Sequence, residues 1–103
     1  MQLARVRGNV VASIKAGGLA AHKLLLLEPV SAAHPLEPGG DERSAAVYVA
    51  IDLAGAGVGE VVLVTRGSAA RVDADGQSAP TDAAVIAIVD SVQLDGVATF
   101  VKR

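Results

Sequence analysis

The 103-residue sequence contains no cysteine and no tryptophan, and Tyr48 and Phe100 are its only tyrosine and phenylalanine. Without cysteine there can be no disulfide framework, no thiolate zinc site and no thiol nucleophile, which suits a reducing cytoplasm. The shortage of aromatic side chains argues against a protein that binds single-stranded nucleic acid, because such proteins stack bases on aromatic rings.

A large excess of charge of one sign is also absent. Nine Lys and Arg residues face eleven Asp and Glu residues, so the formal net charge is −2 at pH 7. A dedicated nucleic-acid-binding protein is usually basic, and this chain is slightly acidic. A disordered chain combines low hydrophobicity with high net charge, whereas 51% of these residues are hydrophobic.

Long apolar runs are absent as well. Residues 24–27 are four consecutive leucines, but Glu28 and Pro29 end the run, and a membrane-spanning helix needs roughly 20 apolar residues. The two arginines before Val10 superficially resemble the start of a signal peptide, yet the apolar stretch that follows stops at Lys15. We therefore expect a cytoplasmic protein without a membrane segment.

What the chain does contain is a large share of Ala, Val, Leu and Ile. A length of 103 residues predicts a single domain, residues 1–103, because two independent cores need a longer chain. A domain of this size cannot bury all of its apolar surface inside itself. An obligate oligomer interface is one place to bury the rest, so composition favours an oligomer.

Alternation of apolar and polar residues predicts short strands. Residues 2–14 alternate with a period of two, and Gly8 inside them suggests a bulge. Residues 23–30 form a second strand, in which leucine occupies both faces, so both faces should be covered. Residues 31–44 are rich in Pro, Gly and charge and predict an exposed loop.

The second half of the chain continues this pattern. Strands are predicted at residues 45–53 and 60–66, with the turn glycines 55, 57 and 59 between them, and residues 67–71 could form a short helix capped by Ser68. Residues 82–94 could form a strand or a buried helix. Their β-branched content and the Asp95-Gly96 turn, followed by residues 97–101, favour a strand.

Five or six short strands with tight turns and a short helix indicate a mainly β fold. The natural closure for such a set is a small closed, OB-like β-barrel.

The apparent motifs do not form a catalytic or cofactor site. The glycine cluster lacks the G-x-G-x-x-G spacing, since Glu60 stands at its last position, and is better explained as a tight turn. Ser68 is not in a G-x-S-x-G elbow. The two histidines, His22 and His34, are on separate segments. Asp73 and Asp75 near Gly76 lack the acidic ligand that completes a calcium loop. We expect no catalytic residue, cofactor or metal.

Two arginines stay open to interpretation. Arg66 and Arg71 lie on either side of a Gly-Ser-Ala-Ala segment. They could make surface salt bridges, or they could line an opening or a subunit interface, to which arginine is well suited by its planar array of donors.

Several stretches, in this order and spacing, resemble one known family. They are residues 1–8 (MQLARVRG), 23–27 (KLLLL), 52–64 (DLAGAGVGEVVLV), 67–71 (GSAAR) and 80–90 (PTDAAVIAIVD). Together they cover nearly the whole chain, which resembles the EutN/CcmL family of pentameric vertex proteins from bacterial microcompartment shells. The sequence departs from the family pattern in the long, Pro-rich 31–44 loop and at Thr81, where Val is common.

The resemblance implies a β-barrel subunit that assembles as a cyclic pentamer with a structural, non-catalytic role. Such pentamers would occupy the corners of a polyhedral shell in the cytoplasm and contact hexameric shell proteins, with no nucleic-acid or membrane partner. By the same resemblance, subunit contacts or the five-fold axis should involve two segments. They are Gly55, Ala56 and Gly57 in the glycine turn, and Gly67, Ser68, Ala69 and Arg71 in the short helix.

Two other functions stay open at this point. A small barrel could be an OB-like module that binds oligonucleotides, although the missing aromatics and the acidic charge oppose this. A small enzyme could also form its site between subunits, with His22, Asp52 and Arg71 converging across an interface.

Overall fold

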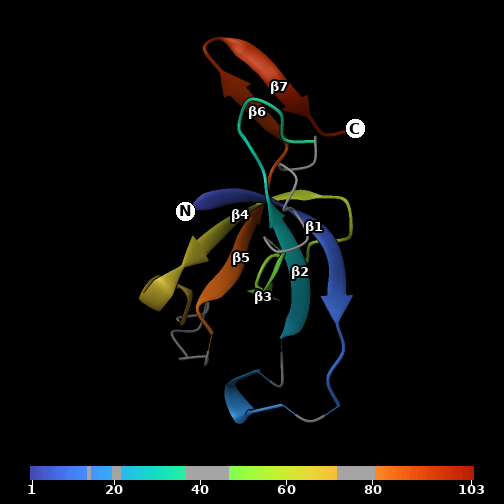
Figure 1. Cartoon of the computed structure of the whole chain (residues 1–103), viewed down its shortest axis with the longest axis vertical. Helices are drawn as coiled ribbons and strands as arrows, with labels where there is room; N and C mark the ends of the chain where they lie inside the picture. The colour runs from blue at the N-terminus through green and yellow to red at the C-terminus, as the bar shows by residue number, and fades with distance from the viewer. Residues whose placement is uncertain (14, 20–21, 37–46, 72–80) are drawn as a thin grey trace.

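The computed structural model describes residues 1–13, 15–19, 22–36, 47–71 and 81–103. Its main body is a closed five-stranded barrel in the order β1-β2-β3-β5-β4 (Figure 1). The barrel strands are β1 (Gln2–Val10), β2 (Lys23–Pro29), β3 (Tyr48–Asp52), β4 (Val61–Arg66) and β5 (Ala83–Ile88). β6 (Ser91–Leu94) and β7 (Val97–Val101) form a separate antiparallel hairpin beyond one end of the barrel. The predicted small closed β-barrel is confirmed.

The first strand follows its alternating pattern. Ala4 and Val6 are buried while Arg7 is exposed, and the register with β2 shifts between Val6 and Gly8, which confirms the predicted bulge. The prediction that this strand extends to residue 14 is wrong, because β1 ends at Val10. Val10 pairs with Leu24 near the start of β2, so the residues that follow have no strand to pair with.

The barrel interior is lined by small and branched apolar side chains. The main core cluster comprises Ala4, Val6, Leu25, Leu27, Ala50, Ala56, Val62, Val64, Ala83 and Val85. A smaller cluster outside the barrel joins Ile51, Ala70 and Ala84, with Leu24 packed against it. The four leucines of β2 therefore have contacts on both faces, as their sequence predicts.

Two short 3-10 helices complete the described chain, η1 (Gly17–Leu19) and η2 (Gly67–Arg71). η2 coincides with the predicted short helix. Ser68 lies inside η2 rather than before it, so its predicted role as the N-cap is wrong. Among the described residues no helix is long and apolar enough to cross a membrane.

The prediction of one strand over residues 82–94 needs correction, because this stretch forms two strands, β5 and β6. The Val89 amide still donates to the Val61 carbonyl oxygen at 2.8 Å, but the Asp90 carbonyl oxygen accepts from the Lys102 amide at 2.7 Å. The chain thus changes partner from β4 to β7 as it leaves the barrel. The predicted turn at Asp95 and Gly96 is confirmed, with φ values of 53° and 79°.

Predictions for residues 14, 37–46 and 72–80 fall outside the described residues. These include most of the predicted 31–44 loop, the start of the strand over residues 45–53, and Asp73 and Asp75.

Candidate subunit-contact site

The 52–60 loop, which carries the first predicted contact segment, is organised by a buried carboxylate. Asp52 Oδ1 accepts hydrogen bonds from the amides of Ala54 at 3.0 Å and Gly55 at 2.9 Å, and Oδ2 accepts one from the amide of Ala56 at 3.0 Å. The Asp52 side chain is 2% exposed. Because one side chain binds three successive amides, the backbone of this turn is held in one shape.

Lys23 and the core hold the same turn against the barrel. Lys23 Nζ lies 3.6 Å from Asp52 Oδ2 and donates to the Ala56 carbonyl oxygen at 3.0 Å. The Ala56 side chain is fully buried in the main core, so it is not available for contact with another subunit. The surface of the loop is formed instead by its exposed residues, among which Val58 is 69% exposed.

The glycines of this loop have different roles. Gly55 and Gly59 have φ values of 81° and 92°, which L side chains rarely adopt, so the predicted tight turn requires glycine at these two positions. Gly57 does not have a positive φ. Its amide donates to Glu60 Oε1 at 2.7 Å and closes the second half of the loop.

Glu60 also connects the loop to the end of the hairpin. Lys102 Nζ lies 2.7 Å from Glu60 Oε2. The hydrogen bond from Lys102, followed by the one from the Gly57 amide, lowers the pKa of the Glu60 carboxyl from its ordinary value of 4.5. The hydrogen bond to Glu60 raises the pKa of Lys102 from its ordinary value of 10.5. Both shifts favour the charged pair.

The second predicted contact segment, η2, presents small residues to solvent. Gly67, Ser68 and Ala69 are exposed, whereas Ala70 is fully buried against the barrel. Gly67 has a φ of 70°, and its amide donates to the Asp82 carbonyl oxygen at 2.9 Å. The backbone of Arg71 belongs to η2, but its side chain is outside the described part of the structure.

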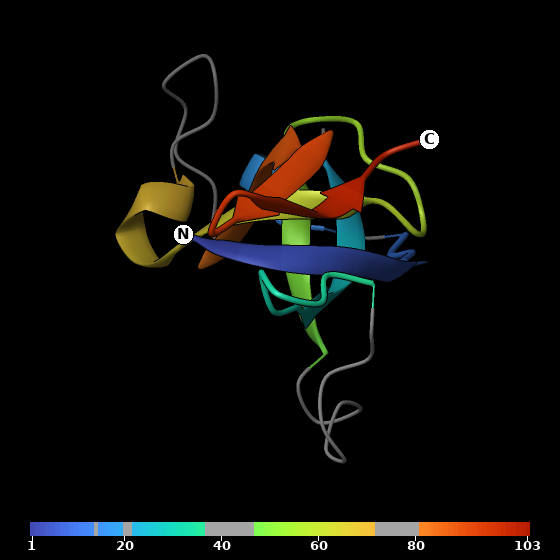
Figure 2. The same ribbon diagram turned by 90° about the horizontal axis from the view of Figure 1, so that it is seen from above.

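The two segments lie on opposite sides of the barrel. In Figure 1 and in the view from above in Figure 2, η2 is at the left and the yellow-green 52–60 loop extends to the right. One subunit therefore does not bring them together. A head-to-tail contact joins different surfaces of neighbouring subunits, so opposite placement is compatible with both segments meeting in a ring.

Sequence reasoning did not find the partner of Arg66. Its guanidinium carbon lies 4.4 Å from the centroid of the Tyr48 ring, which is a cation–π contact. The Tyr48 hydroxyl accepts a hydrogen bond from Gln2 Nε2 at 2.9 Å. Burial raises the pKa of Tyr48 from 10.0, opposed by the neighbouring Arg66. No motif signalled this pair, because its members are distant in sequence.

The arrangement gives no support to oligonucleotide binding. Tyr48 is covered by Arg66 and packs against the core, and Phe100 is 9% exposed. Neither ring is presented on an open strand face where a base could stack.

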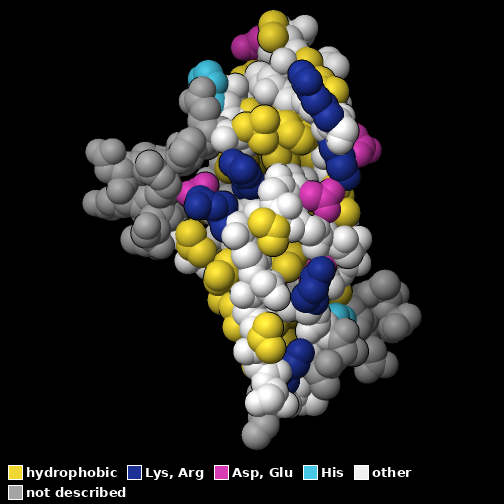
Figure 3. All heavy atoms as spheres, turned by 90° about the vertical axis from the view of Figure 1, so that its right-hand side faces the viewer, with side chains coloured by type: hydrophobic (Ala, Val, Ile, Leu, Met, Phe, Trp, Pro, Cys, Tyr) yellow, Lys and Arg dark blue, Asp and Glu magenta, His cyan; other side chains and the backbone are white. Residues whose placement is uncertain are grey.

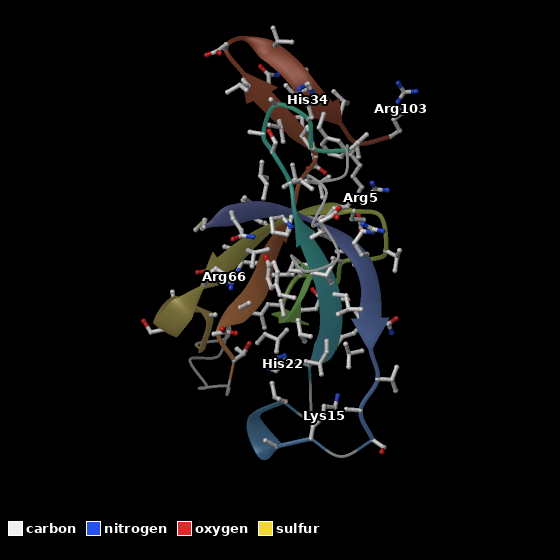
Figure 4. All side chains as sticks on the ribbon, viewed as in Figure 1. Arg5, Lys15, His22, His34, Arg66 and Arg103 are labelled. Atoms are coloured by element: carbon white, nitrogen blue, oxygen red, sulfur yellow. The ribbon has the colours of Figure 1, made fainter. Side chains whose placement is uncertain are left out.

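A catalytic or metal site also lacks support. The Asp52 carboxylate accepts hydrogen bonds from three amides of its own loop, and the side chain of Arg71 lies outside the described part of the structure. His22 and His34 lie at opposite ends of the molecule (Figure 4). Among the described residues, no group of three His, Cys, Asp or Glu side chains could hold a metal ion.

Comparison with known proteins identifies the family. Residues 1–90 match the family described as ethanolamine utilisation protein EutN/carboxysome. The chain belongs to the EutN/CcmL family. It is 41% identical to the carboxysome shell vertex protein CcmL of Synechococcus elongatus over 106 residues, covering 100% of this chain and 97% of that protein.

Solved structures agree with this assignment. The CcmL structure from Gloeobacter violaceus has a TM-score of 0.82 and 41% identity, covering 99% of this chain and 98% of that one. The GrpN pentameric microcompartment shell protein from Rhodospirillum rubrum has a TM-score of 0.74 and 37% identity, covering 91% and 99%. The resemblance read from the sequence is confirmed.

Proposed function

We propose that this chain is a non-catalytic structural protein that forms the pentameric vertices of a bacterial microcompartment shell in the cytoplasm. The observation that carries the proposal is the full-length similarity to a shell vertex protein, together with the shared fold of a pentameric shell protein. Hexagonal units tile a flat layer, and a closed polyhedron needs pentagons at its corners. A pentamer of this chain would fill such a corner, next to hexameric shell proteins.

The surface of the subunit supports assembly. Several large apolar side chains of the described residues are well exposed, including Val58 at 69%, Val97 at 63% and Val101 at 60%. Surface of this kind is a typical component of subunit interfaces. A head-to-tail contact that closes after five copies produces a ring rather than a filament.

Within this ring we place the exposed face of η2 against the 52–60 loop of the next subunit. Gly67, Ser68 and Ala69 allow close approach on one side, and Gly55 and Gly57 allow it on the other. Ala56 would contribute only through its backbone, because its side chain is buried in its own core. Arg71, at the end of η2, belongs to the same proposed contact.

Native mass spectrometry of the purified chain tests the proposal, and the expected dominant species contains five subunits. Ala69→Glu should dissociate this species by placing a charge in the proposed contact, whereas Val11→Glu, at an exposed position just after β1, should not. Co-purification of the pentamer with a hexameric shell protein should follow. A wild-type monomer would contradict the vertex function, whereas an Ala69→Glu pentamer would only remove η2 from the contact.

A further inference from the structure

The hairpin formed by β6 and β7 is held to its own subunit near its base, and its tip projects beyond the barrel (Figure 1). Its two strands pair only with each other in the described structure. Its contacts with the rest of the subunit include the ion pair of Lys102 with Glu60, a 2.6 Å hydrogen bond from the Thr99 hydroxyl to the Ala32 carbonyl oxygen, and the buried ring of Phe100 near the base of the hairpin. An isolated two-stranded hairpin is only marginally stable in water. A further partner would therefore add most support at the tip, where Leu94 and Val97 are exposed.

The tip of the hairpin is apolar on one side of its turn. Leu94 and Val97 are a directly opposed cross-strand pair, and they are 40% and 63% exposed. Between them, the turn presents the exposed carboxylate of Asp95. The tip thus combines an apolar pair with one negative charge.

A groove of matching character lies at the base of the same hairpin. It has a volume of about 330 Å³ and is lined by Leu36, Gly59, Glu60, Val61, Phe100, Val101, Lys102 and Arg103. Its floor is mainly apolar, and Lys102 and Arg103 stand at one end. On this side of the molecule, Figure 3 shows an apolar patch in the upper half with Lys and Arg side chains on two sides of it.

The tip and the groove point away from each other. In Figures 1 and 2 the tip of the hairpin is at the left, while the chain end next to the groove, marked by Arg103 in Figure 4, is at the right. The tip cannot fill the groove of its own subunit. It can reach the groove of a neighbour placed beside it, which is the geometry of a head-to-tail contact.

We propose that the hairpin tip of one subunit packs into the groove of the next copy of this chain. Leu94 and Val97 would contact the apolar floor, and the Asp95 carboxylate would face Arg103, since Lys102 is already paired with Glu60. The contact would cover the apolar surface of the tip and add support at the outer end of the hairpin. This inference rests on the proposed pentamer and adds a second contact between its subunits, besides that of η2 with the 52–60 loop.

Disulfide cross-linking tests the contact directly, because the natural chain has no cysteine. The double variant Val97→Cys/Val101→Cys places one thiol at the tip and one at the groove. Four residues along a strand span about 13 Å, too far for a disulfide, whose Cα atoms lie within about 7 Å. Any disulfide must therefore join two copies. Mild oxidation should give a ladder ending at five subunits, and Val11→Cys/Val101→Cys should give none.

A second variant measures the contribution of the tip. Leu94→Ser/Val97→Ser should raise the concentration at which the pentamer dissociates at least tenfold, with the thermal transition of the barrel retained, whereas Val11→Ser should leave both unchanged. A wild-type pentamer that neither cross-links nor responds to the tip variant would overturn this inference and leave the proposed function standing. A wild-type chain that forms no pentamer would overturn both.

Discussion

The barrel and the hairpin differ in the number of neighbouring strands to which each strand is hydrogen-bonded. Every barrel strand has a neighbour on each side because the sheet closes on itself, and the side chains of the main core cluster are at most 2% exposed. Among the described residues, β6 and β7 pair only with each other, which leaves one edge of each strand unpaired there. Most of their residues are exposed, and Phe100 is the buried exception.

This difference shows where each region obtains its stability. The barrel buries its own apolar surface, and a closed sheet leaves no edge to protect. The residues that match the family end at 90, where the barrel ends and the hairpin begins. The hairpin buries one of its own strand residues, Phe100, so changes in the two regions should have different consequences.

A change in the barrel core should have the largest effect. Leu27 is fully buried in the main cluster, and Leu27→Ala should lower the free energy of unfolding by about 3 kcal/mol, since it removes buried carbon atoms and leaves a cavity. Urea unfolding at a fixed subunit concentration measures this. Val97→Ala is the matched hairpin variant, which should change the unfolding of the barrel by less than about 0.5 kcal/mol. Equal losses for both variants would contradict the comparison.

The buried carboxylate of the 52–60 loop should give the next largest effect. Asp52→Ala leaves three loop amides without their acceptor, and the free energy of unfolding should fall by about 2 kcal/mol. Asp52→Asn keeps one side-chain oxygen as an acceptor, so its free energy of unfolding should fall by less than that of the alanine variant. Thermal unfolding followed by circular dichroism ranks the three proteins. An asparagine variant less stable than the alanine variant would show that the amides are not what Asp52 satisfies.

Much of the barrel could be predicted from sequence because its signals are local. Alternation in β1, the bulge glycine and the Asp95-Gly96 turn each depend on residues close together in the chain. The division of residues 82–94 into two strands could not be predicted. The β-branched residues run on from β5 through Val89 to Val92 with no turn signal, and the break arises because Asp90 bonds to Lys102 while Val89 still bonds to Val61.

The candidate site shows the same limit of local signals. The family resemblance predicted the glycine turn and η2 as contact segments, but their placement on opposite sides of the barrel is seen only in the structure. The sequence placed Asp52 in the predicted strand over residues 45–53 and Glu60 at the start of the strand over residues 60–66, and it indicated no role for either in the turn between them. Their roles depend on amides within the loop and on lysines far along the chain, namely Lys23 and Lys102.

Replacing a glycine of positive φ in the loop beside the groove should have a smaller effect on the free energy of unfolding. A side chain at Gly59 would meet open space, so Gly59→Ala carries only the penalty of its positive φ. The expected loss is about 1–2 kcal/mol in the free energy of unfolding. Gly17→Ala is the control, because its φ is not positive and its new Cβ would also meet open space. Equal losses for the two variants would contradict this account.

The smallest expected effect concerns the ion pair that connects the two regions. Glu60 has a pKa below 4.5 in the folded protein, so its stabilising effect is present above pH 4.5 and is lost as the pH falls through the lowered pKa. Lys102 has a pKa above 10.5, so its effect is present below pH 10.5 and is lost as the pH rises through the raised value. Glu60→Gln should therefore weaken the pH dependence of the melting temperature at both extremes.

The same variant separates the hairpin from the barrel. Near pH 7, Glu60→Gln should speed amide hydrogen exchange in β7 while leaving β1 and β4 unchanged, because the lost ion pair attaches only the end of the hairpin. Asp82→Asn, which changes an exposed carboxylate next to η2, should alter neither β7 exchange nor the pH profile in the way Glu60→Gln does. Equal acceleration in β7 and β1 would mean that the barrel and the hairpin open as one cooperative unit, and that the hairpin is not separately supported.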